Sequence, residues 1–138
     1  MFDHCLYFNA TALARRLERE WSDAFEPFGL TPPQAFMLRA VLERPGMLQH
    51  ELADSLAISR PTATRTLDGL QQKGMIERRG QQPDGRELQI HPTPVALRIK
   101  TALNRASGGV TTRLQQLLGP DDFRQVVSGI KGVRAALE

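Results

Sequence analysis

Hydroxyl and guanidinium groups are concentrated in a short segment, S-R-P-T-A-T-R, at residues 59–65. On a helix, Pro61 and Arg65 lie on one side and are flanked by Thr62 and Thr64. Small hydroxylated residues let a helix approach DNA closely and bond its phosphates, and arginine can form two hydrogen bonds with guanine in the major groove. We therefore expect this segment to contact DNA through Ser59, Arg60, Pro61, Thr62, Thr64 and Arg65.

This segment opens the second of two predicted helices, which are separated by a tight break at residues 57–59. The first helix is expected from about Gln49 to Leu56, and the second runs to Lys73. Ser59 is a suitable N-cap, and Gly74 is a suitable residue for the helix end. The far side of the second helix is apolar and should face a core: Ala63, Leu67 and Leu70. An ordinary helical hairpin with a solvated outer face is the alternative interpretation.

The pattern changes from helical to alternating after Gly74. Residues 75–80 and 87–91 predict two strands, joined by a turn whose strongest signal is Asp84-Gly85. Arg78, Arg79 and Arg86 lie on or beside this hairpin, and we expect Arg78 to contact DNA. A helix-turn-helix followed directly by a basic hairpin predicts a winged helix. A purely structural hairpin with surface arginines is the alternative.

Long amphipathic helices flank this unit. Helices are predicted at about 3–26, 32–43, 93–118 and 121–137. The winged-helix core, about residues 31–92, can bury its own apolar residues, so the helices at about 3–26 and 93–137 carry surplus apolar surface. We expect the whole chain, 1–138, to be one mainly α domain with a small β-hairpin wing, forming a homodimer that places two recognition helices on a palindromic site. Gly108-Gly109 predicts a bend or a close helix contact.

Composition narrows the remaining classes of function. The chain of 138 residues has a net charge of +3 and a pI of about 9.6, which is compatible with nucleic-acid binding without proving it. Cys5 is the single cysteine, so no intrachain disulfide can form. No secretion signal or membrane segment is evident, so a cytoplasmic protein without membrane contact is expected. Motifs for hydrolases, nucleotide binding and zinc peptidases are absent, so we expect no enzyme, no cofactor and no metal site.

Together these features resemble the MarR family of bacterial transcription regulators, over nearly the whole chain. The shared motifs are G-L-T-P-P-Q-A at 29–35, E-L-A-D-S-L-A-I-S-R-P-T-A-T-R at 51–65, L-D-G-L-Q-Q-K-G-M-I-E-R-R at 67–79 and P-D-G-R at 83–86. The resemblance implies a homodimer with a recognition helix in the major groove of double-stranded DNA. It also implies a wing whose Arg86 enters the minor groove, positioned by Asp84. Gly69, His91-Pro92 and Gly108-Gly109 depart from the family pattern.

The resemblance further implies a repressor that releases DNA on binding a small, often phenolic or lipophilic, molecule, in a cleft between the dimer helices and the winged helix. Cys5, in D-H-C-L-Y-F, is similar to the peroxide-sensing cysteine segment of one branch of the family. The hypothesis is a redox sensor oxidised to a sulfenic acid, and the alternative is a small buried interface residue. Two rival hypotheses for the protein as a whole are a metal sensor that uses His4 with Cys5 and a winged helix used for protein contacts. The operator, the signal and the direction of regulation stay open.

Overall fold

The computed structural model describes residues 1–80 and 88–138. In chain order the elements are α1 (Leu6–Phe25), η1 (Glu26–Phe28), α2 (Pro32–Glu43), β1 (Met47–Leu48), α3 (Gln49–Ser55), α4 (Arg60–Gln72), β2 (Ile76–Arg79), β3 (Gln89–Pro92), α5 (Pro94–Leu118) and α6 (Pro120–Leu137). This mainly helical winged helix-turn-helix architecture confirms the predicted fold class. The predicted turn at residues 82–85 lies outside the described residues.

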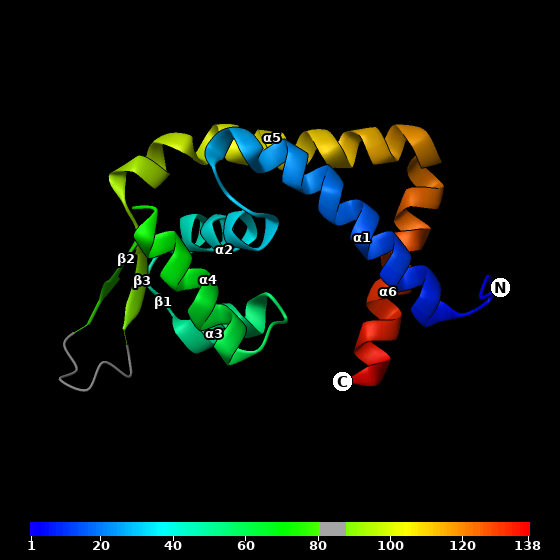
Figure 1. The fold of residues 1–138 in the computed structure, drawn as a ribbon, viewed down its shortest axis with the longest axis horizontal. Helices are drawn as coiled ribbons and strands as arrows, with labels where there is room; N and C mark the ends of the chain where they lie inside the picture. The colour runs from blue at the N-terminus through cyan, green and yellow to red at the C-terminus, as the bar shows by residue number, and fades with distance from the viewer. Residues whose placement is uncertain (81–87) are drawn as a thin grey trace.

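The helices form layers around α2, which lies between α5 on one side and α4 on the other (Figure 1). The strands lie at one end of the molecule, and α6 with both chain termini lies toward the other end. Thr31 begins α2 with a capping box, in which its side chain accepts from the backbone N–H of Gln34 at 3.3 Å and the Gln34 side chain accepts from the backbone N–H of Thr31 at 3.1 Å. The predicted start of α2 is therefore confirmed.

The start and end of α1 differ slightly from the prediction. The helix begins at Leu6 rather than near residue 3, because Cys5 has an extended backbone with φ −87° and ψ 122°. It ends at Phe25, and Pro27 lies in the 3-10 turn η1 that follows. Gly29 then takes φ +67°, a conformation that glycine adopts without the steric cost of a Cβ atom.

The three strands form an antiparallel sheet in the order β1-β3-β2. Met47 pairs with Ile90, so Met47-Leu48 forms a two-residue bridge to the sheet. The second hairpin strand was predicted at residues 87–91, yet β3 extends to Pro92, which pairs with Ile76. Thr93 donates its N–H to the Met75 carbonyl at 3.0 Å, on the β2 side of the chain. Because backbone groups alternate between the two sides of a strand, the backbone nitrogen of Pro92 faces the β1 side. There β1 has already ended, and the missing N–H of the proline removes no sheet hydrogen bond.

The hydrophobic core is continuous from α1 to α5. Its largest fully buried side chains are Phe25, Met37, Leu38, Val41, Leu52, Leu67, Leu70, Ile90 and Leu103. Phe25 belongs to α1 and Leu103 to α5, so the flanking helices complete the core of the winged helix. The predicted unit at 31–92 therefore does not close its core alone, because α5 packs directly over α2.

A large apolar surface nevertheless stays exposed on the flanking helices. It comprises Leu6, Tyr7, Phe8, Leu13, Leu117, Leu118, Val126, Val127, Ile130, Val133 and Leu137. Helix α5 continues unbroken through Gly108 and Gly109, and a Cβ atom at either position would meet nothing within 4 Å. The close helix contact expected at these glycines is therefore not formed within the described chain. No helix in the described ranges is long and apolar enough to cross a membrane.

Candidate nucleic-acid interface

Helix α4 has two chemically distinct faces. Ala63, Leu67 and Leu70 are each 0% exposed and pack in the core, which confirms the predicted apolar face. The opposite side presents Thr64 and Arg65 to solvent, as the helical spacing predicts. Because one face is fully occupied by the core, the hydroxylated and cationic face must point away from the protein.

The turn between α3 and α4 fixes the angle between the two helices. Ala57 adopts φ +55°, an uncommon conformation for a residue with a Cβ atom, and Ile58 donates its N–H to the Ala53 carbonyl at 3.0 Å. Ser59 then caps α4, since its hydroxyl accepts from the backbone N–H of Thr62 at 3.3 Å. The predicted N-cap is confirmed, and Pro61 lies in the first turn of the helix, where its missing N–H costs no helical bond.

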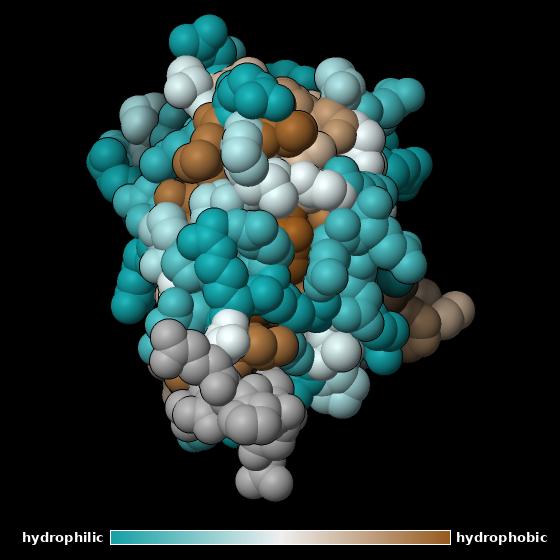
Figure 2. Space-filling model, turned by 90° about the vertical axis from the view of Figure 1, so that its left-hand side faces the viewer, coloured by the Kyte–Doolittle hydropathy of each residue, from teal (hydrophilic) through white to brown (hydrophobic). Residues whose placement is uncertain are grey.

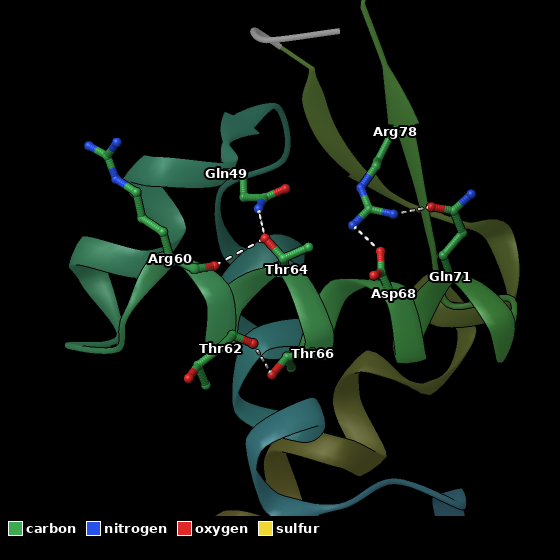
Figure 3. Close-up of polar contacts among 8 residues, drawn as sticks. All are labelled: Gln49, Arg60, Thr62, Thr64, Thr66, Asp68, Gln71 and Arg78. Carbon is green, nitrogen blue, oxygen red and sulfur yellow. Dashed lines mark hydrogen bonds and ion pairs between the residues drawn. The ribbon is translucent and has the colours of Figure 1, made fainter.

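The exposed threonines of α4 already form hydrogen bonds (Figure 3). Thr64 donates its hydroxyl to the Arg60 carbonyl at 3.1 Å and accepts from the Gln49 side-chain amide at 2.6 Å. Thr62 accepts from Arg65 at 3.2 Å. These bonds hold the side chains in defined rotamers, and the Thr64 hydroxyl must leave the Arg60 carbonyl before it can donate to a phosphate. Gln49 was missed by the sequence reasoning, because its partner lies fifteen residues later in the chain.

Arg60 and Arg65 differ from the arginines of the hairpin. Arg60 forms no side-chain hydrogen bond with the described residues, and it points away from the other side chains drawn in Figure 3. Arg65 has only the neutral Thr62 hydroxyl as a side-chain partner within the described ranges. Both guanidinium groups are exposed and are therefore available to an anionic partner.

The two arginines of β2 are both paired with carboxylates. Arg78 forms an ion pair with Asp68 at 2.8 Å and donates to the Gln71 side chain (Figure 3). Arg79 pairs with Glu77 of the same strand, with an Nε–Oε1 distance of 2.9 Å. Arg86 and Asp84, which the resemblance placed in the wing, lie outside the described residues.

Seen from the end that carries the strands, the molecular surface is mainly hydrophilic, with small apolar areas between the polar side chains (Figure 2). Protein–DNA interfaces are more polar and more positively charged than protein–protein interfaces. A surface of this kind therefore suits a charged, hydrated partner better than a large apolar one.

An apolar cavity of about 490 Å³ lies behind the exposed face of α4. Its walls come from α1, from the start of α2 and from the α3–α4 region: Ala14, Leu17, Glu18, Trp21, Pro32, Pro33, Phe36, Leu56, Ile58, Thr62 and Thr66. A cleft between the dimer helices and the winged helix was expected, but its residues could not be named from the sequence, because its walls are formed by segments that are distant along the chain.

A polar network connects three helices beside the cavity. Ser107 of α5 accepts hydrogen bonds from Trp21 at 3.1 Å and from Arg39 at 2.9 Å. Arg39 also donates to Asn104 at 2.8 Å and lies over the Phe36 ring, 5.0 Å from its centroid. Burial lowers the pKa of the Arg39 guanidinium from its ordinary value, because desolvation disfavours the charged form. Trp21 and Phe36 thus connect the cavity wall to this network.

The residues considered for redox or metal sensing lie far from this face. Cys5 is exposed in the single chain and precedes the first turn of α1, a position that both the redox hypothesis and burial in a dimer interface allow. Its neighbour His4 is also exposed. Across residues 1–80 and 88–138, no group of three or more His, Cys, Asp or Glu side chains is arranged to hold a metal ion.

Comparison with known proteins shows which family the central part of this chain resembles. A model described as "MarR family" matches residues 28–87. The uncharacterized HTH-type transcriptional regulator YybA of Bacillus subtilis (strain 168) is 27% identical over 93 residues, which cover 67% of this chain and 62% of YybA. The chain is therefore similar to the MarR family over residues 28–87.

Solved structures share the fold over nearly the full length of the chain. MepR of S. aureus, solved as a DNA complex, matches with a TM-score of 0.87 at 18% identity, covering 99% of this chain and 100% of MepR. The transcriptional repressor CouR, bound to p-coumaroyl-CoA, matches with a TM-score of 0.85 at 23% identity, covering 96% of this chain and 94% of CouR. At these identities the structures establish a common fold. The chain spans less than two thirds of the curated regulators that it matches, such as YybA.

Proposed function

We propose that this protein is a sequence-specific DNA-binding transcription regulator of the MarR family, and not an enzyme. The observation that carries the proposal is the first half of α4, whose exposed face is cationic and hydroxylated while its other face is buried in the core. YybA is named a transcriptional regulator, and MepR was solved with DNA. The proposed DNA-contacting residues are Ser59, Arg60, Pro61, Thr62, Thr64, Arg65 and Arg86, with Asp84 positioning Arg86.

The active form in this proposal is a homodimer on a palindromic site. The exposed apolar side chains of α1, α5 and α6 are more extensive than single scattered residues on a monomer surface. A second copy of the same helices would bury them around a two-fold axis. Such a dimer would present two α4 helices to successive major grooves on one face of DNA.

A salt titration tests the proposed function. Phosphate contacts release counterions, so binding to a duplex should weaken by about 10³ to 10⁵ between about 50 and 200 mM salt if six to ten phosphates are contacted. Fluorescence anisotropy with a labelled duplex, selected by the protein from a random pool, measures this slope. If no duplex binds at the lowest salt concentration, the proposed function fails, and a winged helix used for protein contacts becomes the better interpretation.

The proposed signal is a small lipophilic or phenolic ligand in the apolar cavity, which would release the protein from its operator as a repressor. Thr62 and Thr66 of α4 line this cavity together with Trp21 of α1 and Phe36 of α2. A ligand there would touch the back of the helix that is proposed to read DNA. CouR, which has the same fold, was solved with p-coumaroyl-CoA bound.

Ligand and peroxide triggers predict different results. Trp21 is the single tryptophan and lines the cavity, so simple phenols and fatty acids that bind there should change its fluorescence and weaken DNA binding. The Ala14→Phe variant, which narrows the cavity, should bind DNA normally and lose this response.

If oxidation of Cys5 is the trigger instead, cumene hydroperoxide should release DNA from the parent and not from the Cys5→Ser variant. An equal peroxide response in both proteins would remove the redox hypothesis.

A further inference from the structure

Arg78 has more side-chain partners and a smaller exposed fraction than Arg79, the other arginine of β2. Its guanidinium donates to the Asp68 carboxylate at 2.8 Å and to the Gln71 side-chain oxygen. Only 18% of its side chain is exposed, against 58% for the neighbouring Arg79. Figure 3 shows Arg78 reaching from β2 to α4, where Asp68 and Gln71 both face it.

The side-chain contacts of Arg78 join strand β2 to helix α4, which run in different directions. Asp68 and Gln71 are three residues apart on α4, so both lie on the same stripe of the helix. Gly74, with φ +73°, turns the chain between α4 and β2. The planar guanidinium then bonds two acceptors at once, which constrains both distance and orientation in a way that a point charge does not.

The partners of Arg78 also affect the charge that α4 presents. The Asp68 side chain is 58% exposed and would repel a nearby phosphate if its charge were not balanced. Arg78 neutralises that carboxylate locally, and its donors are already directed at protein acceptors. The pair therefore adds no net positive charge to the exposed face of α4.

We propose that Arg78 is a positioning residue and not a phosphate contact. Together with Asp68 and Gln71 it forms a clamp, the α4–β2 clamp, that sets the angle between the recognition helix and the base of the wing. The inference rests on the proposed DNA-binding function and refines the sequence-based expectation that Arg78 binds DNA. If the inference is correct, loss of Arg78 lowers the affinity for DNA by changing the geometry of the interface. The number of phosphate contacts does not depend on Arg78.

A charge-neutral pair of substitutions separates the two roles. The double variant Asp68→Ala/Arg78→Ala removes the clamp and leaves the net charge unchanged. We expect its affinity for the selected duplex to fall about fivefold, the loss typical of a well-formed but partly exposed ion pair, with the slope of log affinity against log salt unchanged. A lost phosphate contact would instead make the slope shallower by about 0.9 for each recognition helix.

Two further variants complete the experiment. The Arg78→Lys variant keeps the charge and loses the planar fork, so the clamp predicts a loss of affinity close to that of the double variant, whereas a phosphate contact predicts nearly parental binding. The matched control is Glu77→Ala/Arg79→Ala, which removes an ion pair confined to one strand and should bind as the parent does. Thermal unfolding of each variant, together with hydrogen exchange of β2 and β3, shows whether loss of the clamp loosens the strands while the fold persists.

The outcomes distinguish this inference from the proposed function. Weaker binding with a parental salt slope, poor rescue by lysine and faster exchange in β2 support the α4–β2 clamp. A shallower slope in the double variant, or full rescue by lysine, overturns the clamp and leaves the DNA-binding proposal standing. If the parent binds no duplex at low salt, both proposals fail together.

Discussion

The Ile130→Asp variant is expected to be a monomer and to lose a factor of about 10² to 10⁴ in affinity for a palindromic duplex. Ile130 is 48% exposed in the single chain and lies in the apolar stripe of α6 with Val126, Val127 and Val133. If a second copy covers this stripe, aspartate there buries an unpaired charge at a cost of several kcal/mol. The two half-sites would then be bound by independent monomers.

Size-exclusion chromatography with light scattering measures the assembly state, and anisotropy with the same duplex measures the affinity. The matched control is Ser128→Asp, which adds the same charge to an exposed position on the opposite side of α6. That variant should remain a dimer and bind DNA as the parent does. A dimeric Ile130→Asp protein with parental affinity would show that α6 is not at the interface.

The Arg65→Ala variant should lose about 1–3 kcal/mol of binding free energy at each half-site and should also accept more base sequences. Arg65 is exposed, and its side-chain partner in the described chain is the Thr62 hydroxyl at 3.2 Å. A weak neutral bond of this kind is easily exchanged for two hydrogen bonds to guanine. Selection of bound duplexes from a random pool, before and after the substitution, measures both effects.

Two arginines serve as comparisons for Arg65. Arg105 is exposed on α5, away from α4, and Arg105→Ala should leave affinity and sequence preference unchanged. Arg86→Ala should weaken binding to all duplexes by a similar factor, because the minor-groove contact proposed for Arg86 would distinguish fewer base pairs. If Arg65→Ala and the parent select the same sequences with equal affinity, Arg65 does not contact bases. The proposal that α4 lies in the major groove would then be wrong.

Local sequence signals predicted most of the secondary structure. Thr31 with Gln34, and Ser59 before Pro61, specify helix starts through hydrogen bonds within one turn, so their effect depends little on the rest of the chain. The buried stripe of α4 followed from helical spacing. The second hairpin strand was predicted to end at residue 91, whereas the place of Pro92 in β3 depended on where the neighbouring strand β1 ended.

The sequence by itself determined the winged helix-turn-helix order, the face of α4 that points outward and the apolar surplus of the flanking helices. Only the tertiary structure decided what each polar side chain touches. The sequence predicted that Arg78 contacts DNA. In the folded chain its guanidinium instead contacts Asp68 and Gln71 of α4. The cavity beside Trp21 likewise brings together α1, α2 and the α3–α4 region, and the Arg39–Ser107 contact joins α2 to α5. Periodicity and capping act over a few residues, whereas pairing and cavities depend on how distant segments pack.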